Sequence, residues 1–280
     1  HADRRMVEAH FEGLGLPEPD ARLAAGGSDR AMRCAAMVAA LAERWEADPP
    51  DRVLSLGDTD TALATALTAS LLEIPVGHVE AGARSGERDL PEERNRIVID
   101  DLSDLLFCAT DGHAANLGGR GGVHVTGDVM ADLLLAREAD IRARAPRREP
   151  YAVLTLHRAG TADDPAALAR VMRAVGEAGM PVLFPRHPRT RPHVLPANLE
   201  ETDPLPYLDF LGLVAGARFV LTDSGGLQKE AYLLGVPCIT LRDATEWTGT
   251  VDAGWNVLAG TDPGRIAAAA ARPPRGATRP

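Results

Sequence analysis

The chain has 280 residues, 45% of them hydrophobic, which is enough to bury two ordinary domain cores. A formal net charge of −10 and an aromatic content of 4% argue against a nucleic-acid-binding surface. No apolar run reaches the roughly 18 residues that a membrane span needs, and no signal segment opens the chain, so we expect no membrane contact. Cys34, Cys108 and Cys238 are isolated from one another, which disfavours a disulfide framework and fits a reducing cytoplasm.

The first half of the chain predicts short buried strands that alternate with helices. A helix over 3–14 and a longer one over 28–45 precede a break at two consecutive prolines. The strands expected after this break cover 52–56, 74–79, 105–109 and 123–125, and helices are expected over 61–72 and 91–101. Such alternation predicts parallel βαβ crossovers.

A polar run punctuated by prolines over 137–150 has little apolar periodicity and predicts a linker between two domains, 1–145 and 146–280. The second half resumes the same pattern. We expect strands over 151–156, 182–184, 218–221, 238–241 and 256–258, with helices over 165–178, 207–215, 227–234 and 263–271. The chain is therefore predicted to be an α/β protein with two halves of similar size and a binding cleft between them.

Three carboxylates of the first half stand where open α/β sheets place their ligands. Asp58 follows the first expected strand, Glu80 follows the second, and Glu92 lies at the start of a helix. They provide groups for proton transfer, while Arg84 and Arg96 can steady a departing anion. The alternative is that these carboxylates are ordinary helix caps and first-turn charges.

A phosphate site is indicated where a strand of the second half leads into a helix. Ser224, Gly225 and Gly226 offer backbone N–H groups, a hydroxyl and the positive end of the helix, and the glycines allow close approach. A plain glycine turn with Ser224 as N-cap is the alternative. Glu230, six residues beyond Ser224, can reach a sugar hydroxyl, for example a ribose diol.

Two histidines follow strands of the second half, His157 after 151–156 and His187 after 182–184. Both can face the same ligand, although a structural histidine that caps a loop is an equal alternative for each. Neither has metal-ligand spacing, so we expect no catalytic metal and no cofactor. No Gly-x-Ser-x-Gly or Walker-type motif occurs, which leaves acid/base chemistry on a ligand that carries phosphate.

Together, these motifs resemble the non-hydrolysing UDP-N-acetylglucosamine 2-epimerases over about residues 1–266. The resemblance implies two Rossmann-like domains facing across a cleft, the glycosyltransferase-B architecture. It also implies conversion of UDP-GlcNAc to UDP-ManNAc without metal or NAD, through UDP elimination to a 2-acetamidoglucal and re-addition. The motifs are Gly-Asp-Thr at 57–59, His-Val-Glu-Ala-Gly at 78–82, Pro-Glu-Glu at 91–93, Asn-Arg at 95–96, His-Arg at 157–158 and Asp-Ser-Gly-Gly at 223–226.

Roles for individual residues follow from the resemblance alone. It assigns the reaction centre to Asp58, Glu80, Glu92 and His157, and leaves open which carboxylate acts as base and which as acid. We expect a UDP-sugar as the ligand and a homodimer as the assembly. The UDP contacts implied are Ser224, Gly225 and Gly226 at the diphosphate, Glu230 at the ribose, Phe210 beside the uracil, and Arg96 and His187 as further contacts.

The chain also departs from the family pattern. Family members usually open with a strand and a Gly-Thr-Arg-Pro-Glu type loop and end with a further helix, and no segment of this sequence corresponds to either. Without that strand, we expect an exposed apolar edge beside the carboxylates. Gly160 and Thr161 stand where a Glu-Asn pair is usual. The alternatives are therefore a truncated, non-catalytic nucleotide-sugar binding or regulatory protein, and a glycosyltransferase of the same architecture.

Overall fold

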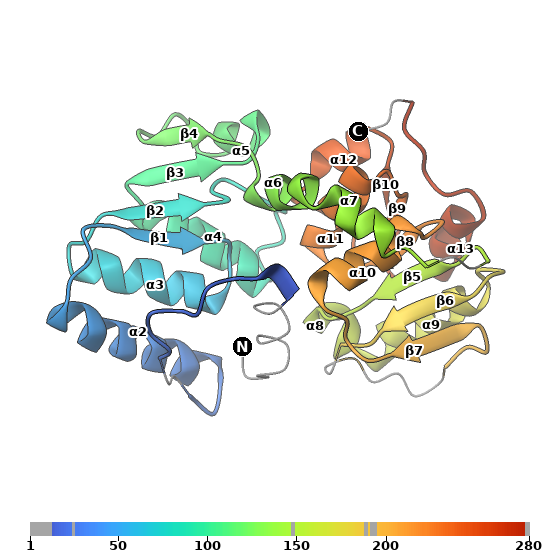
Figure 1. The fold of residues 1–280 in the computed structure, drawn as a ribbon, viewed down its shortest axis with the longest axis horizontal. Coiled ribbons are helices and arrows are strands. Elements are labelled where there is room, and N and C mark those ends of the chain that lie inside the picture. The colour runs from blue at the N-terminus through green and yellow to red at the C-terminus, as the bar shows by residue number, and fades with distance from the viewer. Residues whose placement is uncertain (1–12, 24–25, 147–148, 188–189, 191–194, 278–280) are drawn as a thin grey trace. The chain divides into compact units, whose positions relative to one another are not determined.

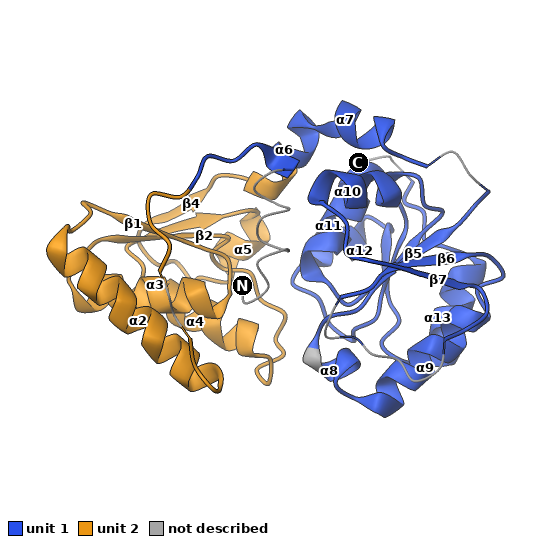
Figure 2. Cartoon of the chain, turned by 60° about the horizontal axis from the view of Figure 1, so that its bottom comes forward, with its two compact units in different colours: residues 1–18, 133–280 blue, residues 19–132 orange. Residues whose placement is uncertain are grey.

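The structure is a computed structural model that describes residues 13–23, 26–146, 149–187, 190 and 195–277 (Figure 1). The chain divides into two compact units (Figure 2). Unit 1 comprises residues 1–18 and 133–280, and unit 2 comprises residues 19–132. The helix expected over 3–14 lies outside the described residues except for its last two positions. Each unit is built on its own parallel sheet.

Unit 2 contains a four-stranded parallel sheet with the strands in sequence order. α3 packs against this sheet, and α2 packs on α3 as an outer layer that buries none of its own residues (Figure 1). The core lies between sheet and helices around Val53, Ala66, Val76 and Ile99. The elements are α2 (Arg30–Ala47), β1 (Val53–Leu56), α3 (Asp60–Leu71), β2 (Val76–Val79), α4 (Pro91–Leu102), β3 (Leu105–Cys108), α5 (Asp111–Ala115) and β4 (Val123–Val125).

The strand β1 forms one edge of this sheet. Within the described residues, β2 is the only strand that pairs with it. Its alternate side chains point in opposite directions, so Val53 and Ser55 are buried while Leu54 is 61% and Leu56 is 64% exposed. The strand that precedes Asp58 therefore exposes two leucines on one face of the sheet, and it also forms the sheet edge that the sequence predicts beside the carboxylates.

Unit 1 contains a six-stranded parallel sheet in the order β10-β9-β8-β5-β6-β7. Because both faces are covered by helices, the central strands β5 and β8 are apolar up to a threonine at the carboxyl end of each. One core lies around Leu154, Phe184 and Ile266, and the other around Val153 and Leu211. The strands are β5 (Ala152–Thr155), β6 (Val182–Pro185), β7 (Leu199–Thr202), β8 (Val220–Thr222), β9 (Cys238–Thr240) and β10 (Asn256–Leu258). The helices are α6 (Val129–Ala136), α7 (Glu138–Ala143), α8 (Ala159–Ala162), α9 (Pro165–Gly176), α10 (Tyr207–Ala215), α11 (Gly225–Leu234), α12 (Thr248–Asp252) and α13 (Pro263–Ala271).

The division between the units falls before the segment that the sequence predicts as a linker. α7 occupies part of that segment, and its Ile141 is fully buried together with Leu134 in the core that contains Tyr151. Burial of these two side chains attaches α7 and the second half of α6 to unit 1. The division between the units therefore falls within α6, after residue 132, whereas the sequence predicts it at 145. The α/β class and the two Rossmann-like halves are confirmed.

Candidate active site

Asp58 lies in the loop between β1 and α3, at the carboxyl end of the unit 2 sheet. Its Oδ2 accepts a hydrogen bond from Arg96 Nη2 at 2.5 Å, and its backbone carbonyl accepts from Asn95 Nδ2 at 2.8 Å. The Arg96 side chain is only 3% exposed. A hydrogen bond between a guanidinium and a carboxylate is among the stronger ones in proteins. Asp58 is therefore held in place by residues of α4.

Glu80 directly follows β2 in a backbone conformation that is unusual for a residue with a side chain. Its φ is 74°, in the left-handed region. The turn is fixed because the N–H groups of Glu80 and Ala81 both donate to the carbonyl of Phe107, each at 3.0 Å. Non-glycine residues in this conformation are concentrated at functional sites. The half-buried Glu80 side chain thus begins from a rigid turn at the end of the sheet.

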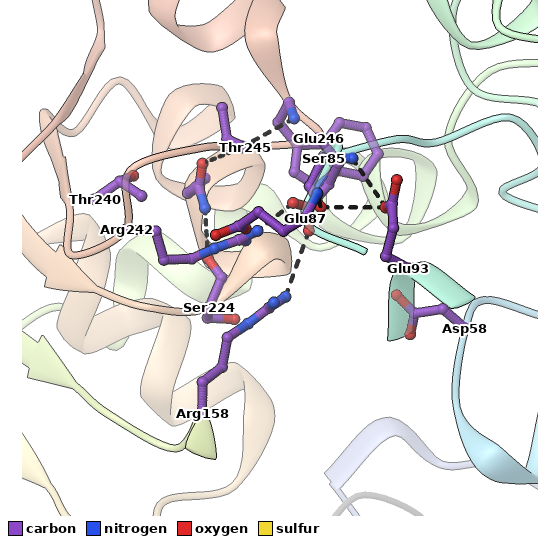
Figure 3. Close-up of polar contacts among 12 residues, drawn as sticks. Asp58, Ser85, Glu87, Glu93, Arg158, Ser224, Thr240, Arg242, Thr245 and Glu246 are labelled. Carbon is purple, nitrogen blue, oxygen red and sulfur yellow. Dashed lines mark hydrogen bonds and ion pairs between the residues drawn. The ribbon is translucent and has the colours of Figure 1, made fainter. Parts of the chain in front are cut away.

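The two glutamates at the start of α4 have different environments. Glu93 is buried, and its carboxylate accepts hydrogen bonds from Ser85 N–H at 3.0 Å and Gly86 N–H at 3.1 Å (Figure 3). Burial raises the pKa of Glu93, but these N–H groups and the charge of Arg96 outweigh burial, so its pKa lies below the usual value. Glu92 remains half-exposed. Glu93 therefore holds the loop that contains Ser85 and Gly86, and Glu92 is the glutamate that a ligand can reach.

Arg96 lies between two carboxylates of the same unit. Besides Asp58, it contacts Glu93, with Nη1 at 3.2 Å from Oε2. The sequence predicts Arg96 as a contact to UDP, and the contacts in unit 2 give it the additional role of holding Asp58. Glu93 was not singled out from the sequence. It appears there as part of the Pro-Glu-Glu motif and as an acidic residue in the first turn of a helix, and neither feature indicates a buried contact.

A second buried network in unit 2 was also missed. His78 Nδ1 lies 2.6 Å from Asp100 Oδ1, and both side chains are 0% exposed. Asp100 Oδ2 accepts from Arg84 Nη2 at 2.6 Å and from the N–H of Gly82 at 3.2 Å. Burial raises the pKa of Asp100, but hydrogen bonding and charge from His78 and Arg84 outweigh it and keep the pKa below its usual value.

In unit 1, a single pocket gathers most of the residues that the sequence predicts for UDP. Its wall includes His157, His187, Phe210, Ser224 and Glu230. These residues come from three strand ends and two helices that are as far as 73 positions apart in the chain. Carboxyl ends of parallel strands meet at one edge of a sheet, which brings them together.

His157 is oriented by a buried carboxylate. Asp223 is 0% exposed and lies 3.0 Å from His157 Nδ1, and it also accepts hydrogen bonds from the backbone N–H groups of His157 and Arg158. Because Asp223 is an acceptor, Nδ1 carries the hydrogen, and Nε2 is the nitrogen available to a ligand. The ring of His187 lies 6.0 Å from that of His157 between centroids. Asp223 was part of the motif but had no role assigned to it.

Ser224 and the glycines after it begin the ten-residue helix α11. Ser224 Oγ accepts from the N–H of Leu227 at 3.4 Å, so Ser224 is an N-cap and also lines the pocket. A Cβ on Gly225 would lie 2.1 Å from Glu246 Oε1, so a larger residue there would require the Glu246 side chain to move. Glu246 is held in turn by Arg242 at 2.9 Å and by Arg158 at 3.6 Å (Figure 3). The first N–H groups of α11 have no helical partner and suit an anion.

Glu230 lies one and a half turns further along α11. The hydroxyl of Tyr207 donates to Glu230 Oε1 at 2.7 Å, and Tyr207 lies in the pocket wall with the half-buried Phe210. Both aromatic residues belong to the first turn of α10. The pocket thus offers a helix N-terminus, an oriented carboxylate and an aromatic ring in one cavity.

Two further searches cover only the described part of the chain. It contains no group of three or more His, Cys, Asp or Glu side chains placed to bind a metal ion. None of its helices is both long and apolar enough to cross a membrane.

Several known proteins are similar to this chain in sequence or in structure. The family described as UDP-N-acetylglucosamine 2-epimerase matches residues 1–276. A Pseudomonas aeruginosa protein named UDP-2,3-diacetamido-2,3-dideoxy-D-glucuronate 2-epimerase is 40% identical over 93% of this chain and 78% of its own length. A UDP-N-acetylglucosamine 2-epimerase of Methanococcus maripaludis is 36% identical over 95% of this chain and 80% of its own. The crystal structure of Methanocaldococcus jannaschii UDP-GlcNAc 2-epimerase with UDP-GlcNAc and UDP superposes with a TM-score of 0.88 at 34% identity, covering 96% of this chain and 81% of that one. The resemblance seen in the motifs is thereby confirmed, and the chain belongs to the UDP-N-acetylglucosamine 2-epimerase family of isomerases.

Proposed function

We propose that this protein binds a UDP-sugar in the pocket of unit 1 and inverts the configuration at C2 of its amino sugar. The observation that carries the proposal is the convergence of His157, His187, Phe210, Ser224 and Glu230 on one pocket. Family membership supports the same activity.

Each part of UDP has a matching feature in the pocket. The diphosphate suits the N-terminus of α11, where Gly225 and Gly226 present backbone N–H groups and Ser224 a hydroxyl. The ribose diol suits Glu230, whose carboxylate is oriented by Tyr207. The uracil suits the ring of Phe210, which offers a flat apolar surface.

The proposed reaction is an elimination followed by an addition. A carboxylate removes the C2 proton, the C–H electron pair forms a C1=C2 double bond, and the C1–O bond breaks as UDP departs. Returning the proton to the opposite face of C2 and UDP to C1 of the 2-acetamidoglucal gives the epimer. The C2 proton is not acidified by a ketone, so stabilising the departing UDP is part of catalysis and not only of binding.

The two faces of C2 require two proton-transfer groups. Asp58, Glu80, Glu92 and His157 are the residues we assign to the reaction centre. Asp58 is held in place by its hydrogen bond from Arg96, and His157 presents Nε2 because Asp223 fixes Nδ1. The acid and base steps are not divided further among the carboxylates.

The sugar is either UDP-GlcNAc or a 2,3-diacetamido uronic acid derivative. The second candidate is favoured by the relative from Pseudomonas aeruginosa, which is 40% identical and named for that substrate. The test is to incubate the protein with each nucleotide sugar and separate the C2 epimers by chromatography. We expect one of the two to reach an equilibrium mixture, and we expect Asp58→Asn to abolish the conversion.

Other outcomes of this experiment identify the alternatives. If UDP binds and neither sugar is epimerised, the protein is a nucleotide-sugar binding or regulatory protein. If an added acceptor receives the sugar without free epimerisation, it is a glycosyltransferase. We also expect a homodimer, which light scattering of the purified protein checks.

A further inference from the structure

A fully buried histidine–aspartate pair connects the two loops of unit 2 that carry Asp58 and Glu80. His78 belongs to β2 and Asp100 to α4, and both side chains are 0% exposed. Neither can touch a substrate. The pair can therefore influence the reaction only through the segments that it holds.

The contacts of His78 define its protonation state. Nδ1 lies 2.6 Å from Asp100 Oδ1, and Nε2 lies 3.0 Å from the backbone carbonyl oxygen of Gly57. Both partners are acceptors, and a neutral imidazole has a single N–H. Only the doubly protonated ring donates to both. The negative charge of Asp100 compensates that ring, as a buried cation requires.

One end of the network fixes the loop that carries Asp58. Gly57 immediately precedes Asp58, and its N–H donates to the carbonyl of Val79 at 3.0 Å while its own carbonyl accepts from His78. The φ of Gly57 is 67°, a conformation that glycine adopts without strain. The backbone N–H and the carbonyl of Gly57 are thus both held by β2.

The other end fixes the turn that carries Glu80. Asp100 Oδ2 accepts from the N–H of Gly82, two residues after Glu80, at 3.2 Å, and from Arg84 at 2.6 Å. A Cβ on Gly82 would lie 2.2 Å from the carbonyl oxygen of His113, so the chain is closely packed here. Asp100 is consequently tied to His78, Gly82 and Arg84 at once.

We propose that His78 and Asp100 are positioning residues that form a buried imidazolium–carboxylate pair and set the spacing of Asp58 and Glu80 for proton transfer at C2. This inference rests on the proposed epimerase function. A buried ion pair is often no more stabilising than apolar residues of the same volume, so stability alone does not account for it. Its hydrogen bonds do define the geometry of both loops.

Turnover and UDP affinity test the proposal together. We expect His78→Gln and Asp100→Asn to lower kcat by about 100-fold, because small displacements of reacting groups have effects of that size. The dissociation constant for UDP should remain within about twofold, since every UDP contact proposed above except Arg96 lies in unit 1. Asp101→Asn is the matched control, because Asp101 is the next residue of α4, is exposed and pairs with Arg120 at 2.5 Å.

These outcomes separate positioning from a structural role. Loss of folded protein would lower the signal in both the turnover and the UDP-binding assays. It would also accelerate amide exchange across β1 to β4. Positioning lowers kcat in protein whose sheet is still protected. Wild-type kcat in both His78→Gln and Asp100→Asn, or an equal effect of Asp101→Asn, overturns the proposal.

A second measurement tests the ion pair of His78 and Asp100 without relying on activity. In the wild-type full chain, ¹⁵N NMR of the His78 ring should show both nitrogens protonated at neutral pH. Amide exchange at Gly82 should accelerate at least tenfold in Asp100→Asn and not in Asp101→Asn. If the wild-type protein epimerises neither sugar, the proposed function is wrong. The ¹⁵N NMR and amide-exchange data then still test whether His78 and Asp100 form the ion pair. A singly protonated His78 ring in the wild type, or amide exchange at Gly82 that is unchanged in Asp100→Asn, overturns the proposed ion pair.

Discussion

At the scale of single residues, the Tyr207 hydroxyl orients Glu230 across 2.7 Å in the pocket wall. If Glu230 binds the ribose diol, Tyr207→Phe should weaken UDP binding by about tenfold, since a hydrogen bond to a charged group contributes on the order of 1.5–3 kcal/mol. Binding of 2′,3′-dideoxy-UDP, which lacks the diol, should be unaffected by the substitution. Titration calorimetry of both nucleotides measures the difference.

The control for this prediction is Tyr232→Phe, a tyrosine of α11 that does not line the pocket. It should bind both nucleotides as the wild type does. Equal losses of UDP and of its dideoxy analogue in Tyr207→Phe would show that Tyr207 supports the pocket generally and does not act through the ribose.

The three cysteines differ in reactivity for a physical reason. Burial raises the pKa of Cys108 to about 11 and that of Cys238 to about 12, so both are thiols near neutral pH. Cys34 is half-exposed on α2. We expect a thiol reagent at pH 8 to modify Cys34 in the native protein and all three after denaturation. Rapid native labelling of Cys108 or Cys238, read by peptide mass spectrometry, would contradict this account.

At the scale of elements, the turn after β2 depends on glycine at position 82. Its φ is 73°, and an added Cβ would meet a backbone oxygen. Gly82→Ala should destabilise unit 2 by about 1–3 kcal/mol, the usual cost of local backbone strain. Gly121→Ala is the control, because no atom lies within 4 Å of its added Cβ and its φ is not positive. Urea unfolding compares them, and equal midpoints would refute the prediction.

The elements that could be predicted from sequence are those with a clear period. α10 and α13 have the predicted bounds, and β4 does too. α7, α8 and α12 have six residues or fewer, too few for a helical period to be recognised. β7 has the sequence Leu-Glu-Glu-Thr and is mostly exposed, so it lacks the apolar pattern of a strand.

The site was predictable to a similar extent. Positions beside strand ends, such as Asp58, His157 and Ser224, were recognisable because parallel sheets gather those ends. The pairing of His78 with Asp100, 22 residues apart, and of Asp58 with Arg96, 38 apart, depends on how α4 packs on the sheet. No local spacing in the sequence reports such contacts.

At the scale of the whole molecule, unit 2 should be sensitive to acid. The pKa values of Asp60, Glu93 and Asp100 all lie below their usual values in the folded state. The stability from these carboxylates is fully present above the unfolded pKa of about 4 and is lost as pH falls through the lower folded pKa. Amide exchange in β1 to β4 should therefore accelerate below about pH 4. A weaker dependence on pH is expected in Asp100→Asn, and an unchanged one would contradict the assignment.

The central claim is that the chain, a member of an epimerase family, exchanges the C2 proton of a UDP-sugar. The most direct measurement is ¹H NMR of UDP-GlcNAc, and of the 2,3-diacetamido uronate derivative, incubated with the protein in deuterated water. We expect loss of the C2 proton signal from one substrate, incorporation of one deuterium by mass, and appearance of the C2 epimer. Retention of the C2 proton in both sugars by protein that binds UDP would contradict it.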